Sequence, residues 1–293
     1  MLFRPLRHIA DKFNTLQMGM VAAERVFKLI DRDEKINDGG TISGEKIKGS
    51  ISFKDVDFSY VSGEQVLYEI NLDVKPGEKI AIVGSTGAGK STIINLLSRF
   101  YENETGMITI DNISIKDFSI QFLRKHVGVI LQDVFLFADT IYNNIVLFNT
   151  DVKKEDVYDA AKQIGVHEFI SSLPGGYQYN VKERGVMLSS GQRQLIAFLR
   201  VYLSNPSILV LDEATSSIDS YSEELIQKAI KKITEEKTAI VIAHRLSTIK
   251  NSDRIVVMDK GRVVEVGKHD ELVTIKGGYY SQLYQIQFLQ EAV

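Results

Sequence analysis

The stretch that most constrains the fold of this chain is the apolar run KIAIVG, followed directly by STGAGKST and the helix-period segment IINLLSRF. The run is short and continuously apolar, as expected of a strand buried on both faces of a sheet. Gly84, Gly89, Lys90 and Ser91 have the spacing G-x-x-x-x-G-K-S, which is typical of a phosphate-binding loop between a strand and a helix. A strand that leads directly into a helix predicts an α/β domain.

The chemistry of phosphate binding accounts for each residue type in this loop. Backbone N–H groups have to converge on phosphate oxygens, and glycines keep side chains out of their way. Lys90 can bridge the β- and γ-phosphates, the hydroxyl of Ser91 can hold Mg²⁺, and the helix adds the positive end of its dipole. A glycine-rich turn without a ligand is the alternative interpretation. The candidate phosphate-binding residues are Gly84, Ser85, Thr86, Gly87, Ala88, Gly89, Lys90, Ser91 and Thr92.

Two acidic residues end a second buried run, ILVLDE at residues 208–213. In an open α/β sheet, ligands bind at the C-terminal ends of the strands, where Asp212 and Glu213 would lie. There Asp212 can take part in the Mg²⁺ shell through water, and Glu213 can orient and deprotonate an attacking water. A polar strand end that enters a turn is the alternative.

The pattern after residue 46 predicts an α/β fold with a mostly parallel core sheet. ISFKDVDFSY and YEINLDV alternate apolar and polar residues, as half-buried strands do. After KIAIVG, strand-like runs alternate with helical segments, which favours a parallel sheet. These runs are MITI, VGVIL, SILVLD, TAIVIA and RIVVM. Residues 140–205 have mostly helical periodicity, so we expect an inserted helical subdomain at about residues 133–205.

Residues 1–30 form a separate pattern. Apolar residues recur there at alternating steps of three and four, which predicts a long helix that lies along other helices. They are Leu6, Ile9, Phe13, Leu16, Met20, Ala23, Phe27 and Ile30. Basic residues outnumber acidic ones, which indicates either a solvated helix or a place near an anionic surface. DRDEKINDGG then breaks the pattern, so we expect a helix with a linker at residues 1–45 and the α/β domain at 46–293.

Charge and composition exclude some classes of function. The formal net charge is −3, which gives no general reason to expect a nucleic-acid partner. No run approaches the ~18 consecutive apolar residues of a membrane-spanning helix. The chain contains no cysteine, which excludes a disulfide framework and a thiolate metal site.

Further motifs occur in the order found in the nucleotide-binding domain of ATP-binding-cassette (ABC) transporters, which this chain resembles over about residues 48–288. They are Tyr60 in VDFSY, matching the aromatic residue that stacks on adenine; Gln132 in VILQD, matching the Q-loop; LSSGQ at 188–192, matching the signature motif; Ser217-Ile218-Asp219, matching the D-loop; and His244 in VIAHR, matching the switch histidine. Glu183-Arg184-Gly185 resembles an element typical of exporter-type members.

Each of these residues has a simpler interpretation when taken alone. Tyr60 could be an aromatic residue of an edge strand, and Gln132 a polar surface residue after a strand. His244 could be a buried histidine with satisfied hydrogen bonds, and Asp219 a helix N-cap. The joint order of the motifs favours the resemblance over these alternatives.

The resemblance implies a role for each motif in binding and hydrolysing ATP with Mg²⁺. Two domains would meet head to tail, and each ATP would lie between the phosphate loop of one and the signature motif of the other. Ser91 and Gln132 would ligate Mg²⁺, with Asp212 in the outer shell. The implied catalytic residues are Glu213 as general base, His244 at the γ-phosphate and Gln132. Ser189 and Gly191 would contact the γ-phosphate of the partner's ATP, and Ser190, Gln192 and Asp219 are further implied nucleotide-binding residues.

The resemblance also implies an organisation. The fold would be a P-loop ATPase core with an N-terminal antiparallel β subdomain and an inserted α-helical subdomain. Residues 1–45 resemble the cytoplasmic extension of the last transmembrane helix of exporters that fuse membrane and ATPase domains. The chain would then be the soluble C-terminal part of such a transporter, at the cytoplasmic face of the inner or plasma membrane. A complete protein with a coiled-coil dimerisation arm is the alternative.

Two residues depart from the family pattern. Ser190 replaces the first glycine of LSGGQ, and if that position needs a positive φ, a serine there costs on the order of 1 kcal/mol. Leu195 stands where many members have arginine. Because Glu213 and His244 are intact, we expect a competent site.

Other classes of protein share the core motifs. Chromosome-maintenance and DNA-repair ATPases carry a long coiled coil between the Gln loop and the signature motif, and residues 133–188 leave no room for one. Soluble regulators such as translation factors usually have two cassettes in tandem, whereas this chain has one. We therefore expect an exporter-type ATPase domain whose partners are a second ATPase domain and a transmembrane domain.

Overall fold

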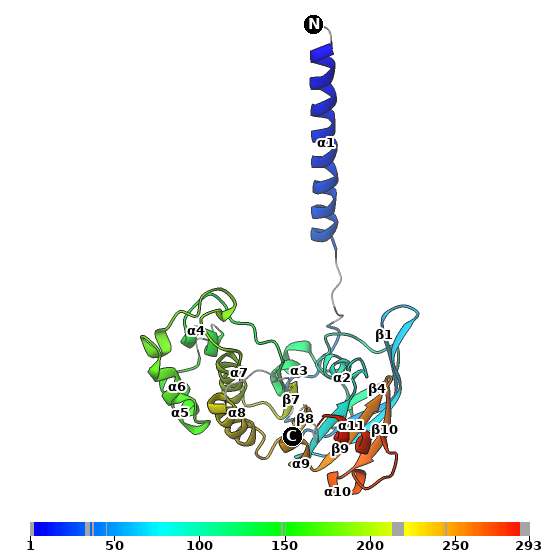
Figure 1. Cartoon of the computed structure of the whole chain (residues 1–293), viewed down its shortest axis with the longest axis vertical. Coiled ribbons are helices and arrows are strands. Elements are labelled where there is room, and N and C mark those ends of the chain that lie inside the picture. Colours follow the sequence, from blue (N-terminus) through cyan, green and yellow to red (C-terminus); the bar gives the residue numbers. More distant parts are fainter. Residues whose placement is uncertain are drawn as a thin grey trace. The chain divides into compact units, whose positions relative to one another are not determined.

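The computed structural model describes residues 3–32, 36, 38–44, 46–147, 149, 151–212, 220–243 and 245–287. The chain divides into two compact units, Met1–Asn37 and Asp38–Val293 (Figure 1). This division precedes the boundary that we expect at residue 45. Within the described residues, no helix is both long and apolar enough to cross a membrane.

The smaller unit consists of helix α1, Phe3–Ile30, which contains the predicted apolar seam. None of its residues is buried, and the seam residues Leu6 and Phe13 are more than half exposed. Lys28 and Glu24, one turn apart, form an ion pair at 2.8 Å on the helix surface. Because a seam of period 3.5 stabilises a helix mainly through packing, this seam is suited to a helical partner.

The larger unit contains two sheets. The four-stranded antiparallel sheet has the order β2-β1-β4-β5, with β1 at Ile51–Val61, β2 at Glu64–Val74, β4 at Thr105–Ile110 and β5 at Ile113–Ser114. The six-stranded sheet has the order β10-β9-β3-β8-β7-β6, with β3 at Lys79–Gly84, β6 at Val127–Ile130, β7 at Ile208–Asp212, β8 at Thr238–Ile242, β9 at Arg254–Asp259 and β10 at Arg262–Gly267. All pairings in this sheet are parallel except that of β10 with β9. The predicted fold class is confirmed, but MITI lies in β4 of the antiparallel sheet and not in the parallel core.

Helices connect the strands of the larger unit. Outside the region between β6 and β7 these are α2 (Lys90–Leu97), α3 (Ile120–His126), α8 (Ser220–Ile233), α9 (Leu246–Lys250), α10 (His269–Leu272) and α11 (Tyr279–Gln287). Between β6 and β7 lie α4 (Ile141–Val146), α5 (Lys154–Gln163), α6 (His167–Ser172) and α7 (Ser190–Ser204), with 3₁₀ helices at Gly176–Gln178 and Glu183–Gly185. These helices lie in the segment where the sequence predicts an inserted helical subdomain.

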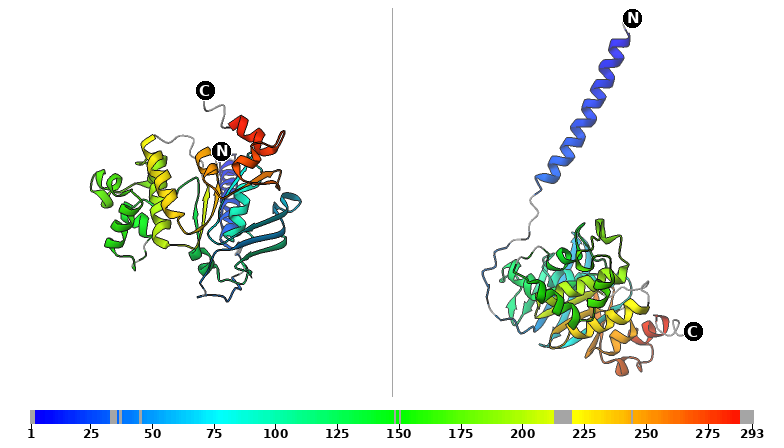
Figure 2. Two further views of the ribbon diagram at one scale, coloured as in Figure 1. Left: turned by 90° about the horizontal axis from the view of Figure 1, so that it is seen from below. Right: turned by 90° about the vertical axis from the view of Figure 1, so that its left-hand side faces the viewer.

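The hydrophobic core lies on both faces of the six-stranded sheet. In β3, Ile80 and Ile82 pack with α2 and the antiparallel sheet, whereas Ala81 and Val83 pack with the helices inserted after β6. In the left view of Figure 2, the green inserted helices and the blue antiparallel strands lie on opposite sides. Burial on both faces explains why KIAIVG is apolar without interruption.

Candidate functional site

The phosphate loop, residues 84–92, joins β3 directly to α2 and needs glycine at two positions. A Cβ atom on Gly84 would lie 2.2 Å from the backbone oxygen of Met258. Gly89, the N-cap of α2, has a φ of 95° and no side-chain cap. A left-handed conformation is unfavourable for residues with a Cβ atom. The loop is therefore a backbone cradle at the positive end of a helix.

Lys90 lies inside this cradle. It is 8% exposed, and its Nζ donates hydrogen bonds to the carbonyl oxygens of Gly84 and Ser85, both at 2.8 Å. Burial lowers the pKa of Lys90, and the negative charge of Asp212 opposes this shift. An ammonium has three N–H donors, so the third can turn to an anion in the loop.

The start of α2 is joined to the end of β7. The Ser91 hydroxyl donates to Oδ2 of Asp212 at 3.3 Å. Because Ile130 of β6 pairs in parallel with Leu211 of β7, exposed Gln132 follows β6 at this same end of the sheet. The described residues contain no group of three or more His, Cys, Asp or Glu side chains placed to hold a metal. A hydroxyl, an amide and one carboxylate fit Mg²⁺, which usually takes few carboxylates and completes its shell with phosphates and water.

Tyr60, at the end of β1, is held by contacts on its ring and on its hydroxyl. The hydroxyl donates to Oγ1 of Thr92 at 3.2 Å and accepts from Nδ2 of Asn95 at 2.8 Å. The ring lies edge to face with Phe58 and Tyr101, at centroid distances of 4.8 and 4.9 Å. The hydrogen bonds to Thr92 and Asn95 fix Tyr60 to α2. Because 43% of Tyr60 is exposed, it is still open to a ligand.

The signature segment, residues 188–192, begins α7 with a capping box. Oγ of Ser189 accepts from the Gln192 N–H at 3.2 Å, and Oε1 of Gln192 accepts from the Ser189 N–H at 3.0 Å. Ser190 and Gly191 are the first two helical residues, whose N–H groups have no acceptor within a helix. Among the described residues, no hydrogen bond or ion pair joins this segment to the phosphate loop.

The two departures from the family pattern have simple structural outcomes. Ser190 is the first residue of α7 and is not among the residues with positive φ, so the penalty considered for a serine does not arise. Leu195 is 1% exposed and packs in the core with the helices on the face of the sheet opposite α2. An apolar residue is therefore well placed there.

Glu213, Asp219 and His244 lie outside the described residues. In the sequence, Glu213 comes directly after β7, which ends at Asp212, and Asp219 comes after Glu213. His244 comes two residues after Ile242, the last residue of β8. The roles that the resemblance implies for these three residues therefore stay predictions.

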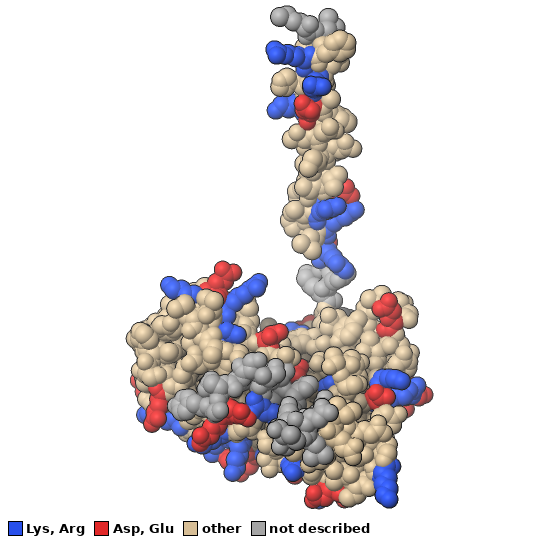
Figure 3. All heavy atoms as spheres, in the orientation of Figure 1, with Lys and Arg blue, Asp and Glu red and all other residues tan. Residues whose placement is uncertain are grey.

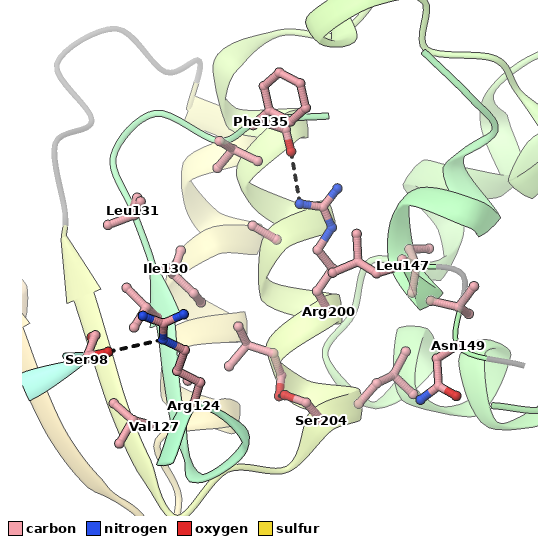
Figure 4. Close-up of a pocket in the computed structure, with 18 of the residues that line it drawn as sticks. Ser98, Arg124, Val127, Ile130, Leu131, Phe135, Leu147, Asn149, Arg200 and Ser204 are labelled. Carbon is pink, nitrogen blue, oxygen red and sulfur yellow. Dashed lines mark hydrogen bonds between the residues drawn. The ribbon is translucent and has the colours of Figure 1, made fainter. Parts of the chain in front are cut away.

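A pocket of about 530 Å³ is lined by Leu131 and Asp133, the chain neighbours of Gln132, and we call it the pocket beside Gln132 (Figure 4). Its walls come from α3 and the residues after α2, from β6, from the segment after Gln132, and from α4 and α7, and several exposed apolar side chains line it. Among them are Leu131, Phe135 and Leu147, which are 45%, 56% and 48% exposed. This pocket could not be predicted from the sequence, because its residues are far apart in the chain.

Arg200, which lines the pocket, and its hydrogen-bond partner Asn144 were not predicted from the sequence either. Asn144 is fully buried in α4, and the Arg200 guanidinium on α7 donates to its backbone and side-chain oxygens. Burial lowers the pKa of Arg200 to about 10. An asparagine in a short apolar helix, IYNNIV, and an arginine in an apolar one, AFLRVYL, are the sequence signals that could have identified them.

Comparisons with known proteins agree with this geometry. The profile of the ABC transporter family matches residues 67–216. The chain is 45% identical over 289 residues to the ABC transporter ATP-binding protein YknV of Bacillus subtilis, covering 98% of this chain and 48% of that protein. It is 45% identical over 292 residues to an ATP-dependent lipid A-core flippase of Methylobacillus flagellatus, covering 98% and 49%.

The fold also matches a solved structure. A bacterial Atm1-family ABC exporter with ATP bound has a TM-score of 0.82 and 37% identity, over 98% of this chain and 50% of that chain. The chain thus spans about half the length of the relatives that it matches. Its phosphate loop, its sheet order and these matches show that the chain belongs to the ABC transporter family and that its larger unit is an ABC ATPase domain.

Proposed function

We propose that this chain is the ATP-binding and ATP-hydrolysing part of an exporter, in which ATP-driven dimerisation powers the export of a substrate across a membrane. The observation that carries the proposal is the preformed phosphate loop, with the buried Lys90 ammonium on two loop carbonyls and beside Asp212. The relatives named as a flippase and an exporter support the link to export.

Within one chain, the phosphate loop would hold the phosphates of ATP. The backbone N–H groups of residues 84–92 would donate to phosphate oxygens, and Lys90 would add its charge. Ser91 and Gln132 would hold Mg²⁺, with Asp212 in the outer shell. Bound Mg²⁺ neutralises charge on the β- and γ-phosphates. Tyr60 would present its ring to the adenine base.

Catalysis would depend on residues that follow β7 and β8. Glu213 would accept a proton from the attacking water, and His244 would stabilise charge that develops on the γ-phosphate. Asp219 would contribute at the interface with the second ATPase domain. The chain order of these residues, and their position after strands that end beside the phosphate loop, support these roles.

The second ATPase domain would be another copy of this chain or a homologous domain, placed head to tail. The support is the start of α7, where the N–H groups of Ser190 and Gly191 have no acceptor within the helix. A helix N-terminus of this kind attracts an anion. We propose that this anion is the γ-phosphate of the ATP held by the partner's phosphate loop, with Ser189 and Gln192 fixing the turn.

The other partner would be a transmembrane domain of the same transporter, with the ATPase part at the cytoplasmic face of the membrane. The pocket beside Gln132 is the surface that we assign to it. Leu131, Phe135 and Leu147 expose apolar area there, and contiguous exposed apolar area marks interaction sites. The relatives are about twice as long as this chain, which supports a further domain that could occupy the pocket.

The distribution of charge does not favour a nucleic-acid partner. On the face of the larger unit shown in Figure 3, basic and acidic side chains are interspersed. A nucleic-acid surface usually collects basic residues on one face. The net charge of −3 agrees with this proposal.

The proposed function is tested by comparing the chain with its Glu213→Gln variant. We expect the parent to hydrolyse MgATP and to be mostly monomeric without nucleotide. The variant should bind MgATP, form a dimer in sedimentation velocity and hydrolyse at least ~100-fold more slowly, because a general base contributes about 10²–10⁴-fold. Near-normal turnover in the variant would remove Glu213 from this role. A parent without ATPase activity would contradict the proposal, and a stable dimer without nucleotide would favour a dimerisation arm.

A further inference from the structure

Helix α7 begins at the signature segment, and its second half is tied to the segment that follows Gln132. In Arg200, Nη1 donates to the Phe135 carbonyl at 3.0 Å (Figure 4). Its Nη2 donates to Oδ1 of Asn144 at 3.0 Å, and its Nε donates to the Asn144 carbonyl. Phe135 comes three residues after Gln132, and Asn144 belongs to α4. One side chain of α7 therefore holds both the segment after Gln132 and the helix that follows it.

Asn144 extends this network. Its Oδ1 also accepts from the Phe137 N–H at 2.8 Å, and its Nδ2 donates to the carbonyl oxygens of Phe137 and Thr140, both at 3.0 Å. The buried side-chain amide thus uses both donors and both acceptor positions. A buried polar network that is fully hydrogen-bonded specifies one arrangement of its members. Residues 135–144 and α7 are therefore held as one body.

The other arginine of the pocket belongs to the opposite wall. Arg124, on α3, donates to the carbonyl oxygens of Ser98 and Arg99, and its guanidinium lies 5.0 Å from the centroid of the Phe100 ring. These contacts join α3 to the end of α2, the helix of the phosphate loop. The pocket therefore separates a wall tied to the phosphate loop from a wall tied to the signature segment.

We propose that Arg200 is a positioning residue that makes the segment after Gln132 and the signature helix α7 move together. The inference rests on the proposed function, because it links the Gln132 of one ATP site to the signature segment that serves the other. A movement of residues 132–137, caused by nucleotide or by a partner in the pocket, is passed through Arg200 to Ser189 and Gly191.

Arginine suits this role better than lysine. Its planar guanidinium directs several donors at fixed angles, whereas a lysine ammonium is a compact charge on a flexible stem. Here the acceptors are two backbone carbonyls from different segments and one side-chain amide. Arg200→Lys keeps the charge and most of the volume but cannot satisfy all three acceptors.

The experiment compares Arg200→Lys with Arg254→Lys, each made in the Glu213→Gln chain. Arg254 is a matched control, because its guanidinium also binds several acceptors, the Glu78 carboxylate and the Asp73 carbonyl, at the opposite end of the sheet from the phosphate loop. We expect Arg200→Lys to bind a fluorescent ATP analogue as a monomer within about twofold of its parent. Its ATP-dependent dimer should dissociate with a constant at least tenfold higher, while Arg254→Lys matches the parent in both measurements.

Different outcomes separate the possible failures. If the parent does not bind ATP or dimerise with it, the proposed function is wrong and the inference falls with it. If the parent dimerises and Arg200→Lys dimerises equally well, or if Arg254→Lys is weakened as much, the positioning role is wrong. Loss of monomer binding in parallel with dimerisation would indicate a merely structural role and would also contradict it.

A second measurement does not depend on how the variant folds. In the Glu213→Gln chain, hydrogen exchange is followed without and with MgATP in residues 131–144 and in the first turn of α7. We expect both segments to gain protection over the same range of ATP concentration. Protection of the first turn of α7 at ATP concentrations that leave residues 131–144 unchanged would overturn the inference.

Discussion

The phosphate loop and the signature segment both place the start of a helix where an anion can bind, but they are built in different ways. Helix α2 starts at Gly89, which has a left-handed backbone and no side-chain cap, and Lys90 fills the loop from within. Helix α7 starts with a capping box between Ser189 and Gln192 and leaves its first N–H groups directed away from the helix. The first start is shaped by close packing around its glycines, and the second by a reciprocal pair of local hydrogen bonds.

This difference indicates where each half of an ATP site is completed. The phosphate loop is packed against Met258 and Leu67 and joined to Asp212, so its own domain holds it in shape. Among the described residues, no hydrogen bond or ion pair joins the signature segment to that loop, and under the proposed function its anion would come from a second ATPase domain. Substitutions in the first should affect binding by one chain, and substitutions in the second should affect association of two chains.

The largest effect is expected for Lys90→Ala. Removing a preorganised donor at the phosphates should lower ATP hydrolysis by roughly 10²–10³-fold, and it should weaken binding of ATP to the monomer. Lys79→Ala, at the other end of β3, is the matched control and should hydrolyse ATP like the parent. Steady-state kinetics and nucleotide titration measure both effects. Parental hydrolysis by Lys90→Ala would show that the loop is not the phosphate site.

A pair of substitutions tests the need for glycine in the two helix starts. Gly89→Ala forces a residue with a Cβ atom into a left-handed conformation and places that atom 2.6 Å from Cδ2 of Leu67. The free energy of unfolding should fall by about 1–2 kcal/mol, with at least tenfold weaker ATP binding to the monomer. Ser190→Gly lies at an ordinary helical position and should keep ATP hydrolysis within about threefold. A tenfold gain in Ser190→Gly, equivalent to about 1.4 kcal/mol of barrier, would show that serine is unfavourable there.

Removal of the helix cap separates stability from association. Ser189→Ala should reduce the free energy of unfolding by about 1 kcal/mol, because it removes the acceptor of the Gln192 N–H. Ser119→Ala, which removes the N-cap of α3, should cost about the same in denaturant unfolding. Only Ser189→Ala should also weaken the ATP-dependent dimer seen by sedimentation. Equal dimerisation of the two variants would place the signature segment outside the partner's ATP site.

The smallest effect is expected for Tyr60→Phe. The substitution keeps the ring and its contacts with Phe58 and Tyr101 but removes the hydrogen bonds to Thr92 and Asn95. Since the hydroxyl only orients the ring, KM for ATP should rise about twofold, near the lower end of the effect of one hydrogen bond, with kcat unchanged. Tyr101→Phe, which keeps its ring contact, is the control. A fall in kcat without a change in KM would contradict an orienting role.

Part of the site could be predicted from sequence because its chemistry is local. The glycine spacing, Lys90 and Ser91 belong to one loop, and their roles depend on neighbours along the chain. The placement of MITI could not be predicted in this way, because an apolar run does not reveal which strand it pairs with, and β4 pairs with β1. The conformation of Ser190 also depended on where α7 begins, which the capping box of Ser189 and Gln192 decides.

The class of fold, the phosphate loop and the order of the motifs can be predicted from the sequence, because short-range periodicity and spacing encode them. The contacts of Asp212 with Ser91, of Asn95 and Tyr101 with Tyr60, and of Arg200 with the segment after Gln132 depend on the tertiary structure. These contacts join residues that are distant in sequence. They form because burial in a shared core brings the strand ends and helices together, and polar groups taken out of water there need partners.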